Sequence, residues 1–174
     1  MKKRPEEIMS NLILIGRPAA GKSTVGVILA KLLGYCFIDT DLLIQSREGR
    51  RLREIIADRG VDGFLAIEED VCLGIRTDRC VIATGGSAVY SEAAMAHFKA
   101  LGHVVYLQTD YETLSGRLKD MRSRGVVLKP GQTLAALYAE RTALYEKYAD
   151  LTVSEGGSTL EETAREVYRK YAQG

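Results

Sequence analysis

The residues Gly16-Arg17-Pro18-Ala19-Ala20-Gly21-Lys22-Ser23-Thr24 connect an apolar run to a segment with helical periodicity. The run before them is Leu12 to Ile15, and the segment after them extends from Val25 to Leu33. This order predicts a strand, a glycine loop and a helix. The Gly-x4-Gly-Lys-Ser spacing is typical of a phosphate-binding loop, in which backbone N–H groups and the helix N-terminus face phosphate oxygens. The alternative is a turn that only joins a strand to a helix.

Under the phosphate-loop interpretation, the loop holds a nucleotide. Lys22 is then expected to reach the β- and γ-phosphates, and the hydroxyl of Ser23 to ligate Mg²⁺. The residues predicted to surround the nucleotide phosphates are Gly16, Ala19, Ala20, Gly21, Lys22, Ser23 and Thr24.

The length and the charge of the chain restrict its class. With 174 residues, the chain is predicted to form one domain, residues 1–174. A net charge of +1 indicates no nucleic acid or anionic membrane as a partner. We expect a monomer whose partner is a small molecule.

The cysteines and the apolar runs bear on location. Cys36, Cys72 and Cys80 are odd in number and widely spaced, which favours reduced thiols over a disulfide or zinc framework. No apolar stretch reaches the roughly 18 residues that a membrane span needs. A cytoplasmic location is therefore expected.

Five apolar runs alternate with helical segments, which is typical of an α/β fold with helices on both faces of a parallel sheet. The runs are Asn11 to Ile15, Tyr35 to Ile38, Cys80 to Ala83, His103 to Leu107 and Leu151 to Val153. The stretch from about 42 to 75 is helical with breaks at Gly49 and Gly60, and it is predicted to form a flap. Residues from about 122 to 133 are predicted to form a lid loop.

Two carboxylates, Asp39 and Asp41, follow the second run, where open α/β sheets bind ligands. Asp39 is predicted to hold an Mg²⁺-bound water, and Asp41 to orient an acceptor hydroxyl or take its proton. A helix N-cap is the alternative role for Asp41, and both roles can hold together.

Further candidates lie after the third run and in the carboxyl half. Gly85 and Gly86 allow a ligand to approach the backbone closely, or form a plain turn. Arg117, Arg124 and Arg141 are cations that can neutralise the charge of phosphoryl transfer, although each is also compatible with a solvated surface charge.

Together, the phosphate loop, Asp39-x-Asp41, Gly85-Gly86, a lid arginine and an arginine in the next helix resemble shikimate kinases. The resemblance implies a three-layer P-loop NTPase fold with parallel strand order 2-3-1-4-5, and ATP-dependent phosphorylation of a hydroxyl on a small metabolite. It also implies that Asp41, Gly85, Gly86 and Arg141 bind the substrate, with Arg141 on its carboxylate. Arg117 would stack on adenine, and Arg124 would act with Lys22 and Asp41 in catalysis.

One position departs from the motif of that family. Leu65 stands where shikimate kinases usually have an arginine for the substrate carboxylate. The nucleotide motifs indicate ATP and Mg²⁺, whereas the acceptor motif is altered. Shikimate is the expected acceptor, with gluconate or a hydroxy amino acid as alternatives, and a non-catalytic nucleotide-binding module as the alternative from another class.

Overall fold

The structure is a computed structural model that describes residues 10–110 and 129–173. Its centre is a five-stranded sheet with the order β2-β3-β1-β4-β5, in which every neighbouring pair is parallel. The strands are β1 (Asn11–Ile15), β2 (Cys36–Asp39), β3 (Cys80–Ala83), β4 (Gly102–Gln108) and β5 (Leu151–Ser154). This architecture and strand order confirm the predicted fold.

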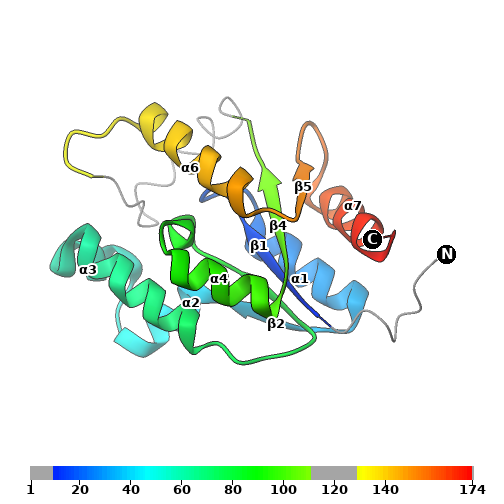
Figure 1. Ribbon diagram of the computed structural model, residues 1–174, viewed down its shortest axis with the longest axis horizontal. Helices are drawn as coiled ribbons and strands as arrows, with labels where there is room; N and C mark the ends of the chain where they lie inside the picture. The colour runs from blue at the N-terminus through cyan, green and yellow to red at the C-terminus, as the bar shows by residue number, and fades with distance from the viewer. Residues whose placement is uncertain (1–9, 111–128, 174) are drawn as a thin grey trace.

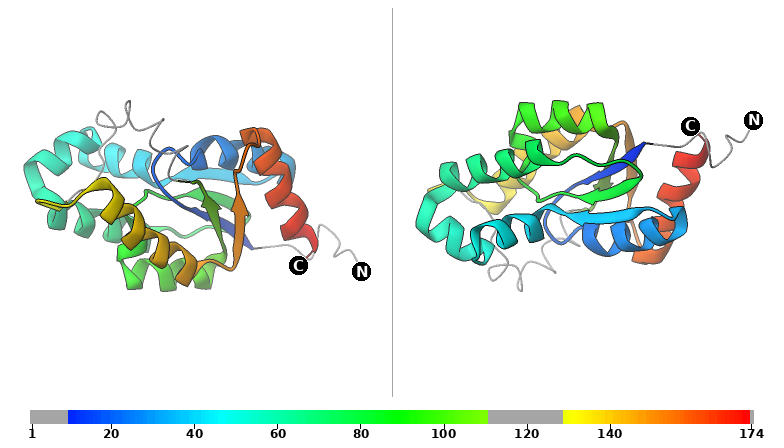
Figure 2. Two further views of the ribbon diagram at one scale, coloured as in Figure 1. Left: turned by 90° about the horizontal axis from the view of Figure 1, so that it is seen from above. Right: turned by 90° about the horizontal axis from the view of Figure 1, so that it is seen from below.

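Helices cover both faces of the sheet (Figures 1 and 2). The helices are α1 (Lys22–Leu33), α2 (Thr40–Glu48), α3 (Leu52–Gly74), α4 (Glu92–Leu101), α6 (Leu134–Tyr148) and α7 (Leu160–Gln173), with a short 3-10 helix η2 (Ala88–Tyr90). Helices α1 and α7 lie on one face, and α4 and α6 lie on the other. Between them the central strands β1 and β3 are fully buried, whereas the edge strands β2 and β5 are partly exposed.

Alternate residues of β1 supply two separate cores. Leu12 and Leu14 pack with Val25 of α1 and Val167 of α7. Ile13 points to the other face and packs against α4 and α6. All five side chains of β1 are buried. Because β1 is paired on both edges and covered on both faces, the loop that follows it starts from a rigid position.

Helices α2 and α3 form a projection with a small core of its own, which contains Ile44, Ile55 and Phe64. The predicted breaks are present: Gly49 ends α2 with φ 65°, and Gly60 interrupts α3 with φ 69° and ψ −178°. Within residues 10–110 and 129–173, no helix is both long and apolar enough to cross a bilayer.

Candidate active site

The loop between β1 and α1 depends on two glycines. Gly16 has φ 146°, and a Cβ there would lie 2.7 Å from the carbonyl oxygen of Leu107. Gly21 has φ 77° and immediately precedes α1. Side chains at either position would be strained, so the loop can follow this path only with glycine.

The other loop residues occupy different surroundings. Ala20 is buried, Ala19 is half-buried with φ 63°, and Ser23 and Thr24 are exposed in the first turn of α1. The backbone of the loop therefore meets the N-terminus of α1, as the phosphate-loop pattern predicts.

Lys22 is the first residue of α1 and is buried. Its ammonium Nζ donates hydrogen bonds to the carbonyl oxygens of Gly16 and Arg17, at 2.7 and 2.6 Å. Burial lowers the pKa of Lys22 to about 8, while the nearby carboxylate of Asp41 acts in the opposite direction. The loop thus holds a partly desolvated cation that a phosphate would stabilise.

Ser23 and Asp39 lie next to each other. The hydroxyl of Ser23 donates to Oδ2 of Asp39 at 2.6 Å. The other oxygen of Asp39, Oδ1, accepts from the backbone N–H groups of Asp41 and Leu42, at 2.9 and 3.3 Å. The N-cap of α2 is therefore Asp39, and the sequence-based alternative that gave this role to Asp41 is wrong. A hydroxyl and a carboxylate oxygen together suit Mg²⁺.

Asp41 points toward the loop after β3. Its Oδ1 lies 2.8 Å from the place where a Cβ on Gly85 would be, and Oε1 of Glu68 lies 2.5 Å from the same place. Burial raises the pKa of Asp41 to about 6, with a further contribution from Asp39. Gly85 is thus required because two acidic side chains occupy the space of its missing side chain.

Glu68 is a member of this cluster that the sequence reasoning missed. It is buried on α3 and accepts a hydrogen bond from the hydroxyl of Ser87 at 2.5 Å. Burial raises its pKa to about 7, and the charge of Asp41 adds to that rise. The signal available in the sequence was its place three residues after Leu65, one helical turn further along the predicted flap.

Glu68→Gln is expected to change how stability depends on pH. The folded-state pKa of Glu68 is raised, so the folded protein binds a proton that the unfolded chain releases, and the unfolding free energy falls as pH rises from about 4.5 to about 7. The groups that face Glu68 are Asp41, Arg141, Lys22 and Ser87.

The glutamine variant should lack this contribution, which is at most about 1.4 kcal/mol per pH unit. Denaturant titrations at pH 5 and pH 7 measure it, with the exposed Glu161→Gln on α7 as the control. Parallel pH slopes for Glu68→Gln and the wild type would contradict the assignment.

Arg141 comes from α6, which lies on the face of the sheet opposite α1, and is buried. Its Nε donates to the hydroxyl of Tyr90 at 3.4 Å, and a Cβ on Gly86 would lie 3.0 Å from its Nη1 and 2.5 Å from Pro18. Gly86 therefore lets the arginine lie close to the phosphate loop. Of the other predicted cations, Arg117 and Arg124 lie outside the described residues.

Acidic and basic groups thus meet at the carboxyl ends of β1, β2 and β3, beside a phosphate-binding loop. This fold and this group define the chain as a P-loop phosphotransferase of the small-molecule kinase class. Comparison with known proteins agrees: the sequence profile described as "Shikimate kinase" matches residues 18–172. The chain belongs to the shikimate kinase family.

Individual relatives cover nearly the whole chain. Shikimate kinase of Thiobacillus denitrificans is 38% identical over 164 residues, which are 92% of this chain and 89% of that protein. Shikimate kinase of Thermobifida fusca is 37% identical over 155 residues, which are 87% of this chain and 89% of that protein.

Solved structures show the same likeness. Shikimate kinase from Acinetobacter baumannii in complex with shikimate superposes with a TM-score of 0.84 at 30% identity, over 96% of both chains. The enzyme from Aquifex aeolicus gives 0.74 at 30% identity, over 91% of this chain and 94% of that one. The family prediction is therefore confirmed.

Proposed function

We propose that this kinase transfers the γ-phosphoryl group of ATP to a hydroxyl of shikimate. The observation that supports the acceptor site is the meeting of Asp41 and Glu68 with Arg141 around Gly85 and Gly86. The cation can bind an acceptor carboxylate, and the two acidic groups can accept hydrogen bonds from acceptor hydroxyls. Oε1 of Glu68 has no hydrogen-bond partner among the described residues and is available for this purpose.

In the transfer step, the acceptor oxygen forms a bond to the γ-phosphorus and the bond to the β,γ-bridging oxygen breaks, which releases ADP. Asp41 holds the acceptor hydroxyl and receives its proton. Lys22 stabilises the negative charge that develops on the phosphoryl oxygens during transfer. The backbone N–H groups of the loop fix the other phosphates.

Ser23 and Asp39 are the residues that would hold Mg²⁺, Asp39 through a bound water. Bound there, the ion would neutralise phosphate charge and orient the transferring group. We also propose that Arg117 binds adenine and that Arg124 acts in catalysis, as the family resemblance implies, and both residues lie outside the described residues.

Two cations near Tyr90 are candidates to replace the arginine that shikimate kinases usually have at the position of Leu65. Arg141 lies with Cζ 5.4 Å from the centre of the Tyr90 ring, and Lys129 lies with Nζ 5.7 Å from it. Leu65 and Tyr90 line one cavity of about 140 Å³. Arg59 and Lys129 are both mostly exposed and both pair with a carboxylate, but only Lys129 is seen beside Tyr90, among the described residues. We therefore propose Lys129 as the second cation for the acceptor carboxylate.

Leu65→Arg is expected to lower the Michaelis constant for shikimate about tenfold, because a charge-assisted hydrogen bond to a carboxylate contributes about 1.5–3 kcal/mol. Leu65→Met is the matched neutral control. The same Michaelis constant in all three proteins would show that this side chain does not face the acceptor.

The acceptor is tested by ADP release from purified protein with ATP and Mg²⁺. Shikimate should give the highest kcat/KM in a panel that contains gluconate and hydroxy amino acids. Because Leu65 replaces a cation in the acceptor motif, a different best acceptor is the second candidate, and such a result would replace shikimate without removing the kinase. ATP binding without any turnover would indicate a non-catalytic nucleotide-binding module.

We further propose a single kinase domain that acts as a cytoplasmic monomer, with the α2–α3 projection as its acceptor-binding flap. The free thiols of Cys36, Cys72 and Cys80 support a reducing compartment. Light scattering of the purified protein tests the monomer.

A further inference from the structure

The side chain of Arg17 has no place in the phosphate-loop pattern, yet it is 2% exposed. It leaves the loop and reaches the middle of α6. Its Nη1 donates to the carbonyl oxygen of Thr109 at 2.8 Å and to the hydroxyl of Tyr106 at 3.4 Å. Its Nη2 donates to the hydroxyl of Thr142.

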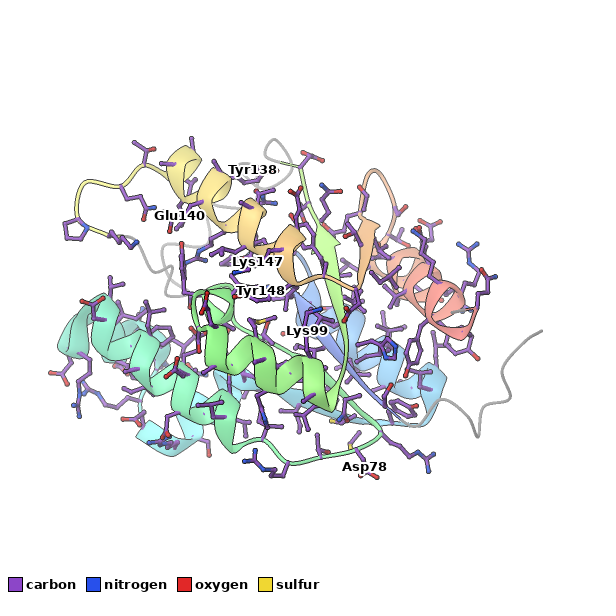
Figure 3. The ribbon with its side chains drawn as sticks, viewed as in Figure 1. Asp78, Lys99, Tyr138, Glu140, Lys147 and Tyr148 are labelled. Carbon is purple, nitrogen blue, oxygen red and sulfur yellow. The ribbon has the colours of Figure 1, made fainter. Side chains whose placement is uncertain are left out.

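An aromatic ring covers the same guanidinium. Cζ of Arg17 lies 3.2 Å from the centre of the Tyr138 ring, and the hydroxyl of Tyr138 donates to the carbonyl oxygen of Thr109 at 3.1 Å. Figure 3 shows Tyr138 on α6 near the end of β4. The guanidinium is therefore enclosed between the sheet and α6, where the hydrogen bonds of its two Nη atoms and a cation–π contact replace part of its lost hydration. Its Nε is buried without a hydrogen-bond partner among the described residues.

These contacts connect the two halves of the active site. The carbonyl oxygen of Arg17 accepts a hydrogen bond from Lys22, which is the phosphate-binding lysine. The guanidinium binds Thr142, the residue that follows Arg141 in α6. One residue thus contacts both the nucleotide cation and the helical turn that carries the acceptor cation.

Two of the three groups that accept a hydrogen bond from Arg17 keep another hydrogen-bond partner without it. Without it, the carbonyl oxygen of Thr109 still accepts from Tyr138, and the hydroxyl of Thr142 still donates to the carbonyl oxygen of Tyr138 at 2.6 Å. Burying a guanidinium is costly, and an apolar side chain of similar length is often equally stable. Stability alone therefore gives little reason for an arginine at this position.

We propose that Arg17 is a positioning residue that fixes the acceptor-binding turn of α6 against the phosphate loop, and so sets Arg141 relative to Lys22. This inference rests on the proposed function of Arg141 in binding the acceptor. Small displacements between reacting groups reduce rates strongly. The contacts of the Arg17 guanidinium with Thr109 and Thr142, here called the brace, should therefore matter for acceptor use more than for nucleotide binding. The loop backbone and Lys22 are sufficient for nucleotide binding.

The test compares Arg17→Met and Thr142→Val, which both remove the hydrogen bond between these two residues. Arg17→Met also removes the bonds to Thr109 and Tyr106, and Thr142→Val also removes the bond to the carbonyl oxygen of Tyr138. The exposed Arg165→Met on α7 is the matched control. Arg17→Met should raise the acceptor KM about tenfold and lower kcat less. The dissociation constant of ATP without acceptor and the thermal midpoint should stay as in the wild type or, for the midpoint, rise.

Thr142→Val should act in the same direction, and the losses in the double variant should be less than additive, because both single changes remove the same Arg17–Thr142 hydrogen bond. Additive losses, an unchanged acceptor KM, or a loss confined to ATP binding or thermal stability would each overturn the inference.

Hydrogen exchange of α6 amides, measured without substrates, separates the two proposals. Exchange around Thr142 should be faster in Arg17→Met than in the wild type and the control. If exchange rises but the wild type phosphorylates no acceptor in the panel, the proposed function fails and the brace remains. If shikimate is phosphorylated but KM and exchange are unchanged, the brace fails.

Discussion

Replacing Lys22 by alanine should reduce phosphoryl transfer by about a hundredfold to a thousandfold, the usual cost of removing one group that stabilises transition-state charge. The ammonium of Lys22 is buried at the start of α1, where low solvent exposure strengthens its interaction with phosphate oxygens. The loss should fall mainly on kcat, because the loop backbone still binds the other phosphates.

The matched control is Lys31→Ala, which removes an exposed lysine from the last turn of the same helix. Initial rates from ADP release and the dissociation constant of a non-hydrolysable ATP analogue, both measured on each protein, provide the comparison. If Lys22→Ala keeps wild-type turnover, the phosphate-loop assignment fails.

The phosphate loop and the sheet could be predicted from the sequence because both depend on local patterns. Gly16 and Gly21 are fixed by backbone conformation, and the apolar runs are those of strands buried on both faces. Strand β4 is longer at both ends than its apolar core, because Gly102 and Gln108 pair without being apolar.

The roles of Glu68 and Arg17 could not be predicted, because tertiary contacts determine them. Glu68 lies on α3, and its place against Ser87 and Gly85 depends on how that helix packs beside η2. Arg17 occupies a variable position of the loop pattern, and nothing local indicates that it would reach Thr142, far away in the chain. Local signals define motifs, whereas these partners depend on the packing of α3 and α6 onto the sheet.

The helix cap at Asp39, where the sequence had offered Asp41 as the cap, has a similar cause. Both carboxylates follow a strand and precede a helix, so either is suited to cap it. Helix α2 begins at Thr40, two residues earlier than the apolar pattern that starts at Leu42, and this places Asp39 at the cap. The side chain of Asp41 is thereby free of a capping role and can face Gly85.

That geometry leads to the second large effect, which concerns Asp41→Asn. We expect kcat to fall about a hundredfold or more, because the amide keeps the shape of the side chain but cannot accept the proton of the acceptor hydroxyl. ATP affinity should stay near that of the wild type, since no phosphate-loop residue hydrogen-bonds to Asp41 in the part of the chain that the structure describes.

Asp70→Asn is the control, because Asp70 is an exposed carboxylate of the same α2–α3 projection that pairs with Arg47. Single-turnover rates and equilibrium binding of the ATP analogue are measured on both variants. Equal losses of binding and transfer in Asp41→Asn would point to a structural role in α2, and a rate close to the wild type would remove Asp41 from the transfer step. A selective loss of transfer would support Asp41 as the residue that holds the acceptor hydroxyl. Asp39 would then keep two roles, as the N-cap of α2 and as a proposed ligand of an Mg²⁺-bound water.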